Sequence, residues 1–511
     1  MNTILDTTGL SLWELIEARA EASPDKLMAL DETGRTITFA GYRQACLEAA
    51  AGLGGWGISA GDRVSWILPS RFESFTLAGA LSRLGATQVP ILPIYRHREV
   101  GFILEQAEAT SLVVPGVYRD FDFAAMANEI AEGTNTRVLV ADPDLPTTTD
   151  TSGLAPYQPG ADQVRWIFYS SGTTADPKGA KHSDSTISAA NDGMQWGCKV
   201  GPDDVSAVVF PITHVGGLVW LFNSMQTGVK LLITEAFNPA VTPRWLSDNG
   251  CTCAGAGTVF FQTYLRAEAA NAADGGDRLL PDVRIFNGGG APKPPSLHGE
   301  LVNVFGAPLL NGWGLTESPI NTMANTEDPD DMLAETEGRA VPGTEIRVVL
   351  DGADLGPGAE GELWVKGPQV CHGYLDSDLD KEAFVDGWFR TGDLGVVDEK
   401  GFVQITGRLK DIIIRKGENI SSKEIEDLLH THPKVADVAV IGLPDEISGE
   451  RACAVVVTAG DDPLTFEELG DYCSAAALSK HKTPEQLEIV EALPRNPTGK
   501  ILKKDLRASF Y

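Results

Sequence analysis

Basic residues are few for a chain of this length. Lys and Arg together number 41 against 71 Asp and Glu in 511 residues, which gives a formal net charge of −30. An acidic body of this kind repels nucleic acid and anionic membranes, so the sequence argues against a polyanion-binding role. We expect no nucleic-acid partner, and the phosphates of a small ligand would have to meet local clusters of basic side chains.

Long apolar runs are also missing. No uninterrupted run reaches the roughly 18 residues that a transmembrane helix needs. The N-terminal segment MNTILDTTGLSLWELIEARA lacks a basic region followed by an apolar block, so it is not a secretory signal. We therefore expect no integral membrane contact.

Cysteine is scarce and has no framework spacing. The seven cysteines are an odd number scattered along the chain, which points to a reducing, cytoplasmic environment. Cys251 and Cys253 are close enough to suggest a metal site, but no second Cys/His cluster accompanies them. We interpret both as core residues.

What is present is typical of a soluble globular protein. Hydrophobic residues make up 43% and charged residues 22% of the chain, and 511 residues exceed one compact core, so two to four domains are expected. Short apolar strand patterns alternate with helical patterns, which predicts an α/β fold with a largely parallel sheet. The strand patterns cover 63–69, 88–94, 111–115, 137–141, 205–210, 229–234 and 283–286, and two of the helical patterns cover 12–22 and 75–84.

Changes in composition suggest the domain boundaries. A stretch rich in Thr, Pro, Gly and Asp at 147–162 reads as a linker. After 345 the pattern changes to period-two strands, and the last hundred residues read as a compact α+β module. The predicted division is an N-terminal domain at 1–409, made of α/β subdomains at 1–162 and 163–325 and a β-rich subdomain at 326–407, followed by a small α+β C-terminal domain at 410–511.

The segment from Trp166 to Gly179, WIFYSSGTTADPKG, predicts a phosphate-binding loop. An apolar strand pattern gives way to hydroxyls, a glycine and a lysine, which can surround an anion with donors and one positive charge. The Gly-Lys-Ser/Thr of a Walker loop is missing, and an ordinary Ser/Thr-rich turn is the alternative. The candidate residues are Ser170, Ser171, Gly172, Thr173, Thr174 and Lys178.

Two glycine-rich motifs follow. The first comes directly after a strand pattern, at the sheet edge where open α/β sheets bind ligands, and its glycines would let a flat ring approach the backbone; a tight turn is the alternative. The second places an aromatic residue between glycines, where it can stack on adenine, and adds a threonine for a phosphate oxygen and a glutamate for Mg²⁺. The candidates are Gly289, Gly290, Ala291 and Pro292 in the first motif, and Asn311, Gly312, Trp313, Gly314, Thr316 and Glu317 in the second.

These segments resemble the motifs of the adenylate-forming family, which comprises acyl-CoA synthetases, the adenylation domains of peptide synthetases and beetle luciferases. The family loop reads Tyr/Phe-Thr-Ser-Gly-Thr-Thr-Gly-x-Pro-Lys-Gly. Ser170 replaces the usual Thr and keeps its hydroxyl, whereas Ala175 replaces the usual Gly and adds a Cβ where positive φ is needed. Trp313 replaces the usual Tyr, which preserves stacking but removes a hydroxyl contact.

The resemblance implies roles for further residues. Asp393 would accept the ribose hydroxyls, Arg408 would be a second ribose contact, and Lys410 falls on the hinge position of the family. Lys500, in PRNPTGK, would bridge the substrate carboxylate and the α-phosphate. His214, in PITHVGG, would lie between the acyl pocket and the nucleotide, although a packed histidine is the alternative. Lys416 and Gly417 would reach the site after a rotation of the small domain.

The resemblance also implies an activity, that of an AMP-forming acyl-CoA ligase using ATP, Mg²⁺ and coenzyme A. The acyl pocket would be built from 214–220, 258–261 and 288–290, where glycines leave room for a bulky apolar acid and no Lys or Asp is present to pair a charged one. The segment 89–107 is similar to medium-chain and alicyclic (cyclohexanecarboxylate-type) acid CoA ligases. An enzyme that loads a carrier protein, a luciferase-like oxygenase and a silent nucleotide-binding protein stay open as alternatives, as do a monomer and a homodimer.

Overall fold

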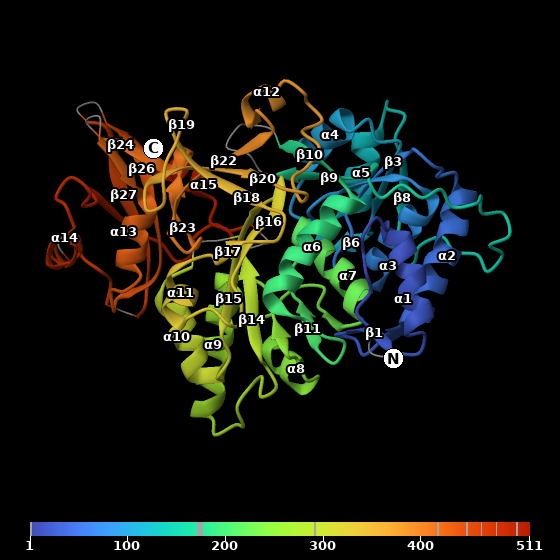
Figure 1. Cartoon of the computed structure of the whole chain (residues 1–511), viewed down its shortest axis with the longest axis horizontal. Coiled ribbons are helices and arrows are strands. Elements are labelled where there is room, and N and C mark those ends of the chain that lie inside the picture. The colour runs from blue at the N-terminus through green and yellow to red at the C-terminus, as the bar shows by residue number, and fades with distance from the viewer. Residues whose placement is uncertain are drawn as a thin grey trace.

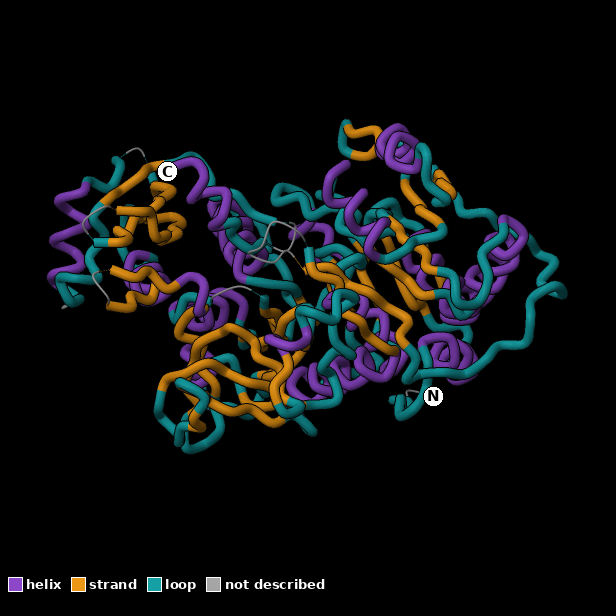
Figure 2. Tube along the Cα trace, turned by 90° about the horizontal axis from the view of Figure 1, so that it is seen from above, coloured by secondary structure: helices purple, strands orange, loops and turns teal. Residues whose placement is uncertain are grey.

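The computed structural model describes residues 3–170, 177–290, 293–415, 418–445, 448–460, 462–476, 478–496 and 499–510. A large lobe carries most of the chain, and a small lobe formed by the C-terminal residues lies at one end of the long axis (Figure 1). The view from above shows the N-terminus in the half of the molecule opposite the small lobe (Figure 2).

Two sheets organise the large lobe. The larger has nine strands in the order β17-β16-β15-β14-β13-β11-β12-β1-β2, and from β15 through to β1 its neighbours are parallel. Its strands are β1 (Leu27–Asp31), β2 (Thr36–Thr38), β11 (Val205–Val208), β12 (Lys230–Ile233), β13 (Cys253–Ala254), β14 (Ile285–Gly289), β15 (Leu309–Leu315), β16 (Ser318–Met323) and β17 (Arg339–Ala340).

The second sheet has six strands in the order β10-β9-β4-β3-β5-β8, and only the β9–β10 pair is antiparallel. A largely parallel α/β architecture is therefore confirmed. These strands are β3 (Arg63–Trp66), β4 (Thr87–Pro90), β5 (Ser111–Val114), β8 (Arg137–Val140), β9 (Val164–Ser170) and β10 (Lys178–Ser183), and a separate hairpin is formed by β6 (Val117–Tyr118) and β7 (Phe121–Asp122).

The two sheets exchange strands, which corrects one prediction. The β1 and β2 strands precede residue 162 but belong to the nine-stranded sheet, whereas β9 and β10 follow it and belong to the six-stranded sheet. The division into consecutive subdomains at 1–162 and 163–325 is therefore wrong as a description of the sheets. Local patterns show where strands occur, but the pairing of distant strands is decided by tertiary packing.

Helices cover both faces of each sheet. The largest core lies between the sheets, where α1, α2, α3, α6 and α7 pack against both, and smaller cores join α8, α9 and α10 to the nine-stranded sheet and α4 and α5 to the other. The helices are α1 (Leu12–Ala22), α2 (Phe39–Trp56), α3 (Phe72–Leu84), α4 (His97–Gln106), α5 (Phe123–Ala131), α6 (Asp184–Cys198), α7 (Val215–Thr227), α8 (Thr242–Asp248), α9 (Thr258–Ala273), α10 (Ser296–Phe305), α11 (Asp330–Glu335) and α12 (Asp380–Ala383).

A third sheet and the small lobe complete the chain. The third sheet runs β19-β18-β20-β22-β21 with β23 beside β22, and the small lobe contains the sheet β25-β24-β27-β26 with β28 beside β27. The elements are β18 (Glu345–Leu350), β19 (Ala353–Asp354), β20 (Glu360–Lys366), β21 (Phe384–Val385), β22 (Trp388–Val397), β23 (Val403–Arg408), η1 (Leu409–Asp411), β24 (Ile412–Arg415), β25 (Glu418–Ser421), α13 (Ser422–Leu429), β26 (Val435–Asp445), β27 (Gly449–Thr458), α14 (Phe466–Ala475), β28 (Gln486–Ile489) and α15 (Lys503–Phe510).

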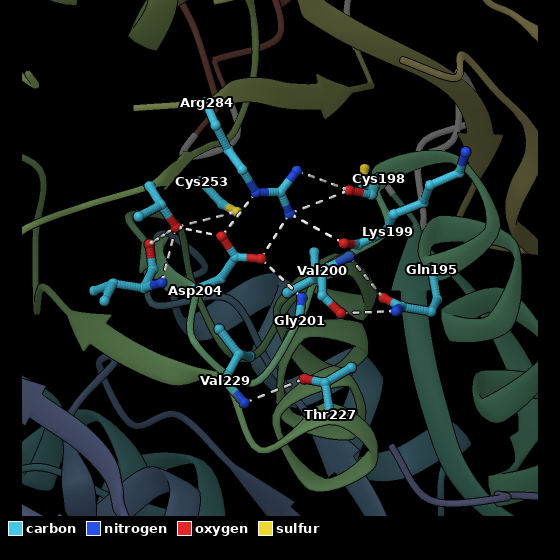
Figure 3. A network of polar contacts seen from close by, with 12 residues as sticks. Gln195, Cys198, Lys199, Val200, Gly201, Asp204, Thr227, Val229, Cys253 and Arg284 are labelled. Atoms are coloured by element: carbon cyan, nitrogen blue, oxygen red, sulfur yellow. Dashed lines mark hydrogen bonds and ion pairs between the residues drawn. The ribbon is translucent and has the colours of Figure 1, made fainter. Parts of the chain in front are cut away.

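A polar network stabilises the amino edge of the nine-stranded sheet. Arg284, just before β14, forms an ion pair of 2.6 Å with Asp204, just before β11, and donates to the carbonyl oxygens of Cys198 and Lys199 (Figure 3). Thr252 donates a further hydrogen bond of 2.7 Å to Asp204. Because the strands concerned are parallel, this network lies at the end opposite their carboxyl edge and serves to tie strands together.

All seven cysteines are buried and free, so the interpretation of Cys251 and Cys253 as core residues is confirmed. In the part of the chain that the structure describes, no group of three or more His, Cys, Asp or Glu residues could hold a metal ion. No helix in that part has the length and apolarity needed to cross a bilayer.

Candidate active site

The two glycine motifs lie side by side at the carboxyl edge of the nine-stranded sheet. Gly288 is opposite Asn311 and Gly289 is opposite Gly312 in the parallel pair β14–β15. A Cβ atom on Gly289 would lie only 2.3 Å from the carbonyl oxygen of Gly312. The strands can approach this closely only because glycine occupies the position. Ala291 and Pro292 lie outside the described residues.

Gly288 and Gly217 do not open the large acyl pocket that the sequence suggests. A Cβ on Gly288 would lie 2.5 Å from the carbonyl oxygen of Ala256, and one on Gly217 would lie 2.4 Å from that of Pro211. These glycines serve close backbone packing, so the expectation that they leave room for a bulky acid is wrong. At Gly290, with φ +79°, the added atom would meet open space.

The predicted phosphate loop connects two antiparallel strands. Ser170 at the end of β9 is paired with Lys178 at the start of β10, so the segment between them closes a hairpin. The hydroxyl of Ser170 donates a hydrogen bond of 3.1 Å to Oε1 of Glu317. The structure therefore brings the first candidate residue of the loop, Ser170, next to the predicted Mg²⁺ carboxylate. Ser171, Gly172, Thr173, Thr174 and Ala175 lie outside the described residues.

Tyr374 is a site residue that the sequence motifs did not reveal. Its hydroxyl donates to Oε1 of Glu317 at 2.8 Å, and the ammonium of Lys178 lies 5.7 Å from its ring centroid. A β-bridge between Tyr374 and Ala180 of β10 holds it there. The contact depends on segments far apart in sequence, and a lone tyrosine between Gly and Leu carries no local signal of it.

His182 was also missed. It is fully buried in β10, and Nε2 donates a hydrogen bond of 2.8 Å to the carbonyl oxygen of Thr316. Burial lowers the pKa of His182 to about 4, so the ring is neutral at physiological pH. It fixes the backbone of Thr316 next to Glu317. The tight hairpin that follows requires Gly314, because a Cβ there would lie 1.8 Å from the carbonyl oxygen of Pro319.

Asp393, Arg408 and Trp313 form a second cluster. Asp393 on β22 and Arg408 on β23 are direct cross-strand neighbours, and the guanidinium of Arg408 donates to Oδ1 of the carboxylate. Nε1 of Trp313 donates to Oδ2 at 2.8 Å. Trp313 is only 6% exposed and packs in the core of the third sheet, so little of its indole is left for an adenine to stack on. Adenine stacking stays a prediction that this burial disfavours.

His214 caps the first turn of α7. Its Nδ1 accepts a hydrogen bond of 3.1 Å from the N–H of Gly216, which assigns the proton of the neutral ring to Nε2. Burial and then the nearby ammonium of Lys500 lower the pKa of His214 to about 4, so the ring stays neutral at physiological pH. Nε2 is left as a neutral donor.

Lys500 reaches this region from the small lobe. Its loop is held by hydrogen bonds with Asn496, and a Cβ on Gly499 would lie 3.4 Å from Val259 in the first turn of α9. Burial first, and then the positive charges of Arg408 and Lys410, lower the pKa of Lys500 to about 7, while Asp393 and Asp411 oppose that shift. Lys410 lies in η1, between the lobes, whereas Lys416 and Gly417 lie outside the described residues.

Comparison with known proteins agrees with this geometry. Residues 16–375 match the AMP-binding enzyme family, and residues 424–500 match the AMP-binding enzyme C-terminal domain. The chain belongs to the AMP-binding enzyme family. It is an AMP-forming acid–CoA ligase by class, as the sequence motifs indicate.

Relatives in this family match the chain over nearly its full length. A medium-chain fatty-acid–CoA ligase from Escherichia coli is 32% identical over 97% of this chain and 90% of its own. A salicyl-AMP ligase/salicyl-S-ArCP synthetase from Mycobacterium tuberculosis is 31% identical over the same shares. The named substrates of these two relatives differ widely, so identity at this level determines the class and not the acid.

Solved structures show the same fold. ATP-bound MatB from Rhodopseudomonas palustris matches with a TM-score of 0.86 and 29% identity over 98% of this chain and 99% of its own. Apo MatB from the same organism matches with a TM-score of 0.74. MenE from Bacillus subtilis in complex with ATP and magnesium matches with a TM-score of 0.83 and 25% identity over 96% and 99% of the two chains. The fold of the adenylate-forming family, with a large α/β domain and a small C-terminal domain, is thus confirmed.

Proposed function

We propose that the protein joins a medium-chain, alicyclic or other bulky apolar carboxylic acid to coenzyme A through an acyl-adenylate. The observation that carries the proposal is the position of Lys500, because a Cβ on the preceding Gly499 would lie 3.4 Å from Val259 of the large lobe. A lysine brought by one lobe to the polar edge of another suits a reaction between two anions, a carboxylate and ATP.

The residues at Glu317 fit a magnesium ion. Its hydrogen bonds from Ser170 and Tyr374, as far as the structure describes the site, both fall on Oε1, which leaves Oε2 for a metal with a preference for oxygen ligands. A bound Mg²⁺ would supply positive charge next to the triphosphate. Tyr374 and Ser170 keep the carboxylate in one orientation for that purpose.

The first half-reaction is a displacement at the α-phosphorus of ATP. A carboxylate oxygen of the acid forms the new bond to phosphorus while the bond to pyrophosphate breaks. Lys500 and Lys178 offset the negative charge of the transition state, and the neutral Nε2–H of His214 is positioned to donate to the carboxylate. Asp393 accepts the ribose hydroxyls because a carboxylate can take two hydrogen bonds from a vicinal diol.

In the second half-reaction the thiolate of CoA forms a bond to the acyl carbon, and the bond to AMP breaks. Lys500 occupies the approach to the acyl group, so the small lobe has to turn before the thiol can enter. We place the hinge at Lys410, in the short η1 turn between the lobes, and expect Lys416 and Gly417 to face the site after the turn.

The substrate class rests on the pocket segments and one relative. The segments 214–220 and 258–261 read HVGGLVW and TVFF, with no acidic or lysine side chain to pair a charged group on the acid. Gly288 and Gly217 are closed by backbone contacts, whereas an added Cβ at Gly290 would meet open space, so Gly290 is the glycine of these segments that we propose borders the acid. The relative that acts on medium-chain fatty acids supports an apolar chain.

A carrier-loading enzyme is the second candidate, because the salicyl-AMP ligase relative is also named a salicyl-S-ArCP synthetase. The test is AMP formation over a library of straight-chain, alicyclic and aryl acids, with CoA or a purified aryl carrier protein as acceptor. CoA-dependent AMP release with apolar acids supports the proposal, whereas release only with the carrier protein contradicts it.

The burial of all seven thiols and their spacing agree with the cytoplasm as the location we propose.

A further inference from the structure

Two N–H donors from different strands hold the carboxylate of Asp393. The indole Nε1 of Trp313, on β15, donates to Oδ2 at 2.8 Å, and Nε of Arg408, on β23, donates to Oδ1. The β15 strand belongs to the nine-stranded sheet, whereas β22 and β23 belong to the third sheet. The hydrogen bond from Trp313 to Asp393 therefore links the two sheets.

The acceptor count explains what this arrangement can do. An ionised carboxylate offers about four lone-pair positions on its two oxygens. Among the residues that the structure describes, Trp313 and Arg408 take one position on each oxygen, which leaves one position on each. Two remaining positions on neighbouring oxygens match the two hydroxyls of a ribose.

The backbone of Asp393 is fixed separately. Its N–H donates a hydrogen bond of 3.0 Å to Oγ1 of Thr391, and that hydroxyl donates to the carbonyl oxygen of Leu363 at 2.6 Å. These backbone contacts do not restrict rotation of the Asp393 side chain. The hydrogen bonds from the indole of Trp313 and from Arg408 restrict that rotation.

Trp313 is itself rigid. Its backbone N–H donates to Oγ1 of Thr322 at 3.1 Å, and its ring is packed in an apolar cluster. We propose that Trp313 is a positioning residue for sugar recognition, whose indole N–H orients Asp393 toward the ribose hydroxyls. The inference deepens the proposed function and rests on the ribose-binding role that it gives Asp393. The cluster around the ring contains Val348, Leu363, Val365 and Val403.

The test compares ATP with 2′,3′-dideoxy-ATP, both with Mg²⁺, by calorimetric titration of the full-length protein. The ratio of the Kd of 2′,3′-dideoxy-ATP to the Kd of ATP isolates the contribution of the sugar hydroxyls. It needs no knowledge of the acid. We expect Trp313→Phe to lower this ratio about tenfold, since the loss of a hydrogen bond to a charged group is felt directly at the hydroxyls.

A matched control exists on the strand of Asp393. Trp388 is also buried, at 5% exposed, and its ring stacks with the guanidinium of Arg347 at 4.1 Å. Trp388→Phe makes the same change in size and should leave the ratio unchanged. The ratio is measured within each preparation, so a moderate loss of stability in Trp313→Phe does not obscure it.

Asp393→Asn and the double variant separate the possible failures. If Trp313 acts through Asp393, the double variant has the ratio of Asp393→Asn alone. Equal weakening of both nucleotides in Trp313→Phe would show a packing role only and overturn the inference while the proposed function stands. An unchanged ratio in Asp393→Asn would show that Asp393 is not the ribose acceptor, and would overturn the residue assignment and the inference together.

Discussion

The hydroxyl of Tyr374 lies 2.8 Å from Oε1 of Glu317, and the ring of the same side chain lies 5.7 Å from the ammonium of Lys178. One buried side chain therefore contacts both the carboxylate proposed for Mg²⁺ and a lysine proposed for phosphate. Its effect on each can be separated, because the hydroxyl makes one contact and the ring makes the other.

Tyr374→Phe keeps the ring and removes the hydrogen bond to Glu317. We expect the Mg²⁺ concentration for half-maximal adenylation to rise about tenfold, which corresponds to the loss of about 1.4 kcal/mol of orientation of the carboxylate. Tyr374→Leu also removes the ring and should weaken ATP binding further. Titration of Mg²⁺ at fixed ATP gives the measurement. An unchanged Mg²⁺ requirement in Tyr374→Phe would show that the contact has no role in metal binding.

Lys500→Ala should affect the two half-reactions differently. Without the ammonium, acid-dependent exchange of pyrophosphate into ATP should fall by about 10²–10³-fold, in the range of other lost transition-state donors. Transfer from a supplied acyl-adenylate to CoA should be retained. Lys504→Ala, on the exposed side of α15, is the matched control and should resemble the wild type in both assays. Equal loss of adenylate formation and of transfer to CoA in Lys500→Ala would contradict a role of Lys500 in the first half-reaction alone.

The lowered pKa of Lys500 predicts a pH profile. With a pKa of about 7, the free enzyme carries the ammonium below that pH and loses it as pH rises. The kcat/KM for ATP, which reports the free enzyme, should therefore fall above pH 7, whereas kcat should hold to higher pH because bound phosphates favour the ammonium.

Lys500→Arg controls for the ionisation of ATP itself. Arginine stays charged across the whole range, so the variant should be less active but lack the decline in kcat/KM above pH 7. A decline that persists unchanged in Lys500→Arg would assign the titration to the nucleotide or to another group.

The contact between β14 and β15 predicts the effect of one methyl group. Gly289→Ala places a Cβ 2.3 Å from the carbonyl oxygen of Gly312, so the strands must separate, and we expect a stability loss of about 2–3 kcal/mol with loss of ATP binding. Gly299→Ala, exposed in α10 with nothing near the added atom, should stabilise by about 0.5–1 kcal/mol. Urea unfolding measures both. A Gly289→Ala protein of wild-type stability would contradict the described register.

The sequence predicted elements more reliably than contacts. The helix at Leu12–Ala22 has the predicted bounds, because a capping box from Ser11 and Glu14 defines its start locally. The crossing of β1 into the nine-stranded sheet was not predicted, since strand order depends on packing between distant segments. The glycine at 288 was expected to create space, whereas its contact with Ala256 shows that it closes space.

In the candidate site, too, the sequence predicted some residues and missed others. The resemblance to the family's motifs indicated Asp393 and Lys500, and residue chemistry together with that resemblance indicated Glu317. Tyr374 and His182 were missed because their function depends on what they touch, and that is decided by the pairing of β10 with residues far along the chain. Trp313 shows the limit most clearly, since its position between glycines suggested a face for stacking and could not reveal that the ring is packed.

The burial of the cysteines has a practical consequence at the bench. All seven are enclosed, and burial raises their thiol pKa values, so none offers a reactive thiolate to a colorimetric disulfide reagent at neutral pH. The native protein should therefore give a silent background when samples withdrawn from the reaction at timed intervals are titrated, without denaturation, for the CoA sulfhydryl that remains.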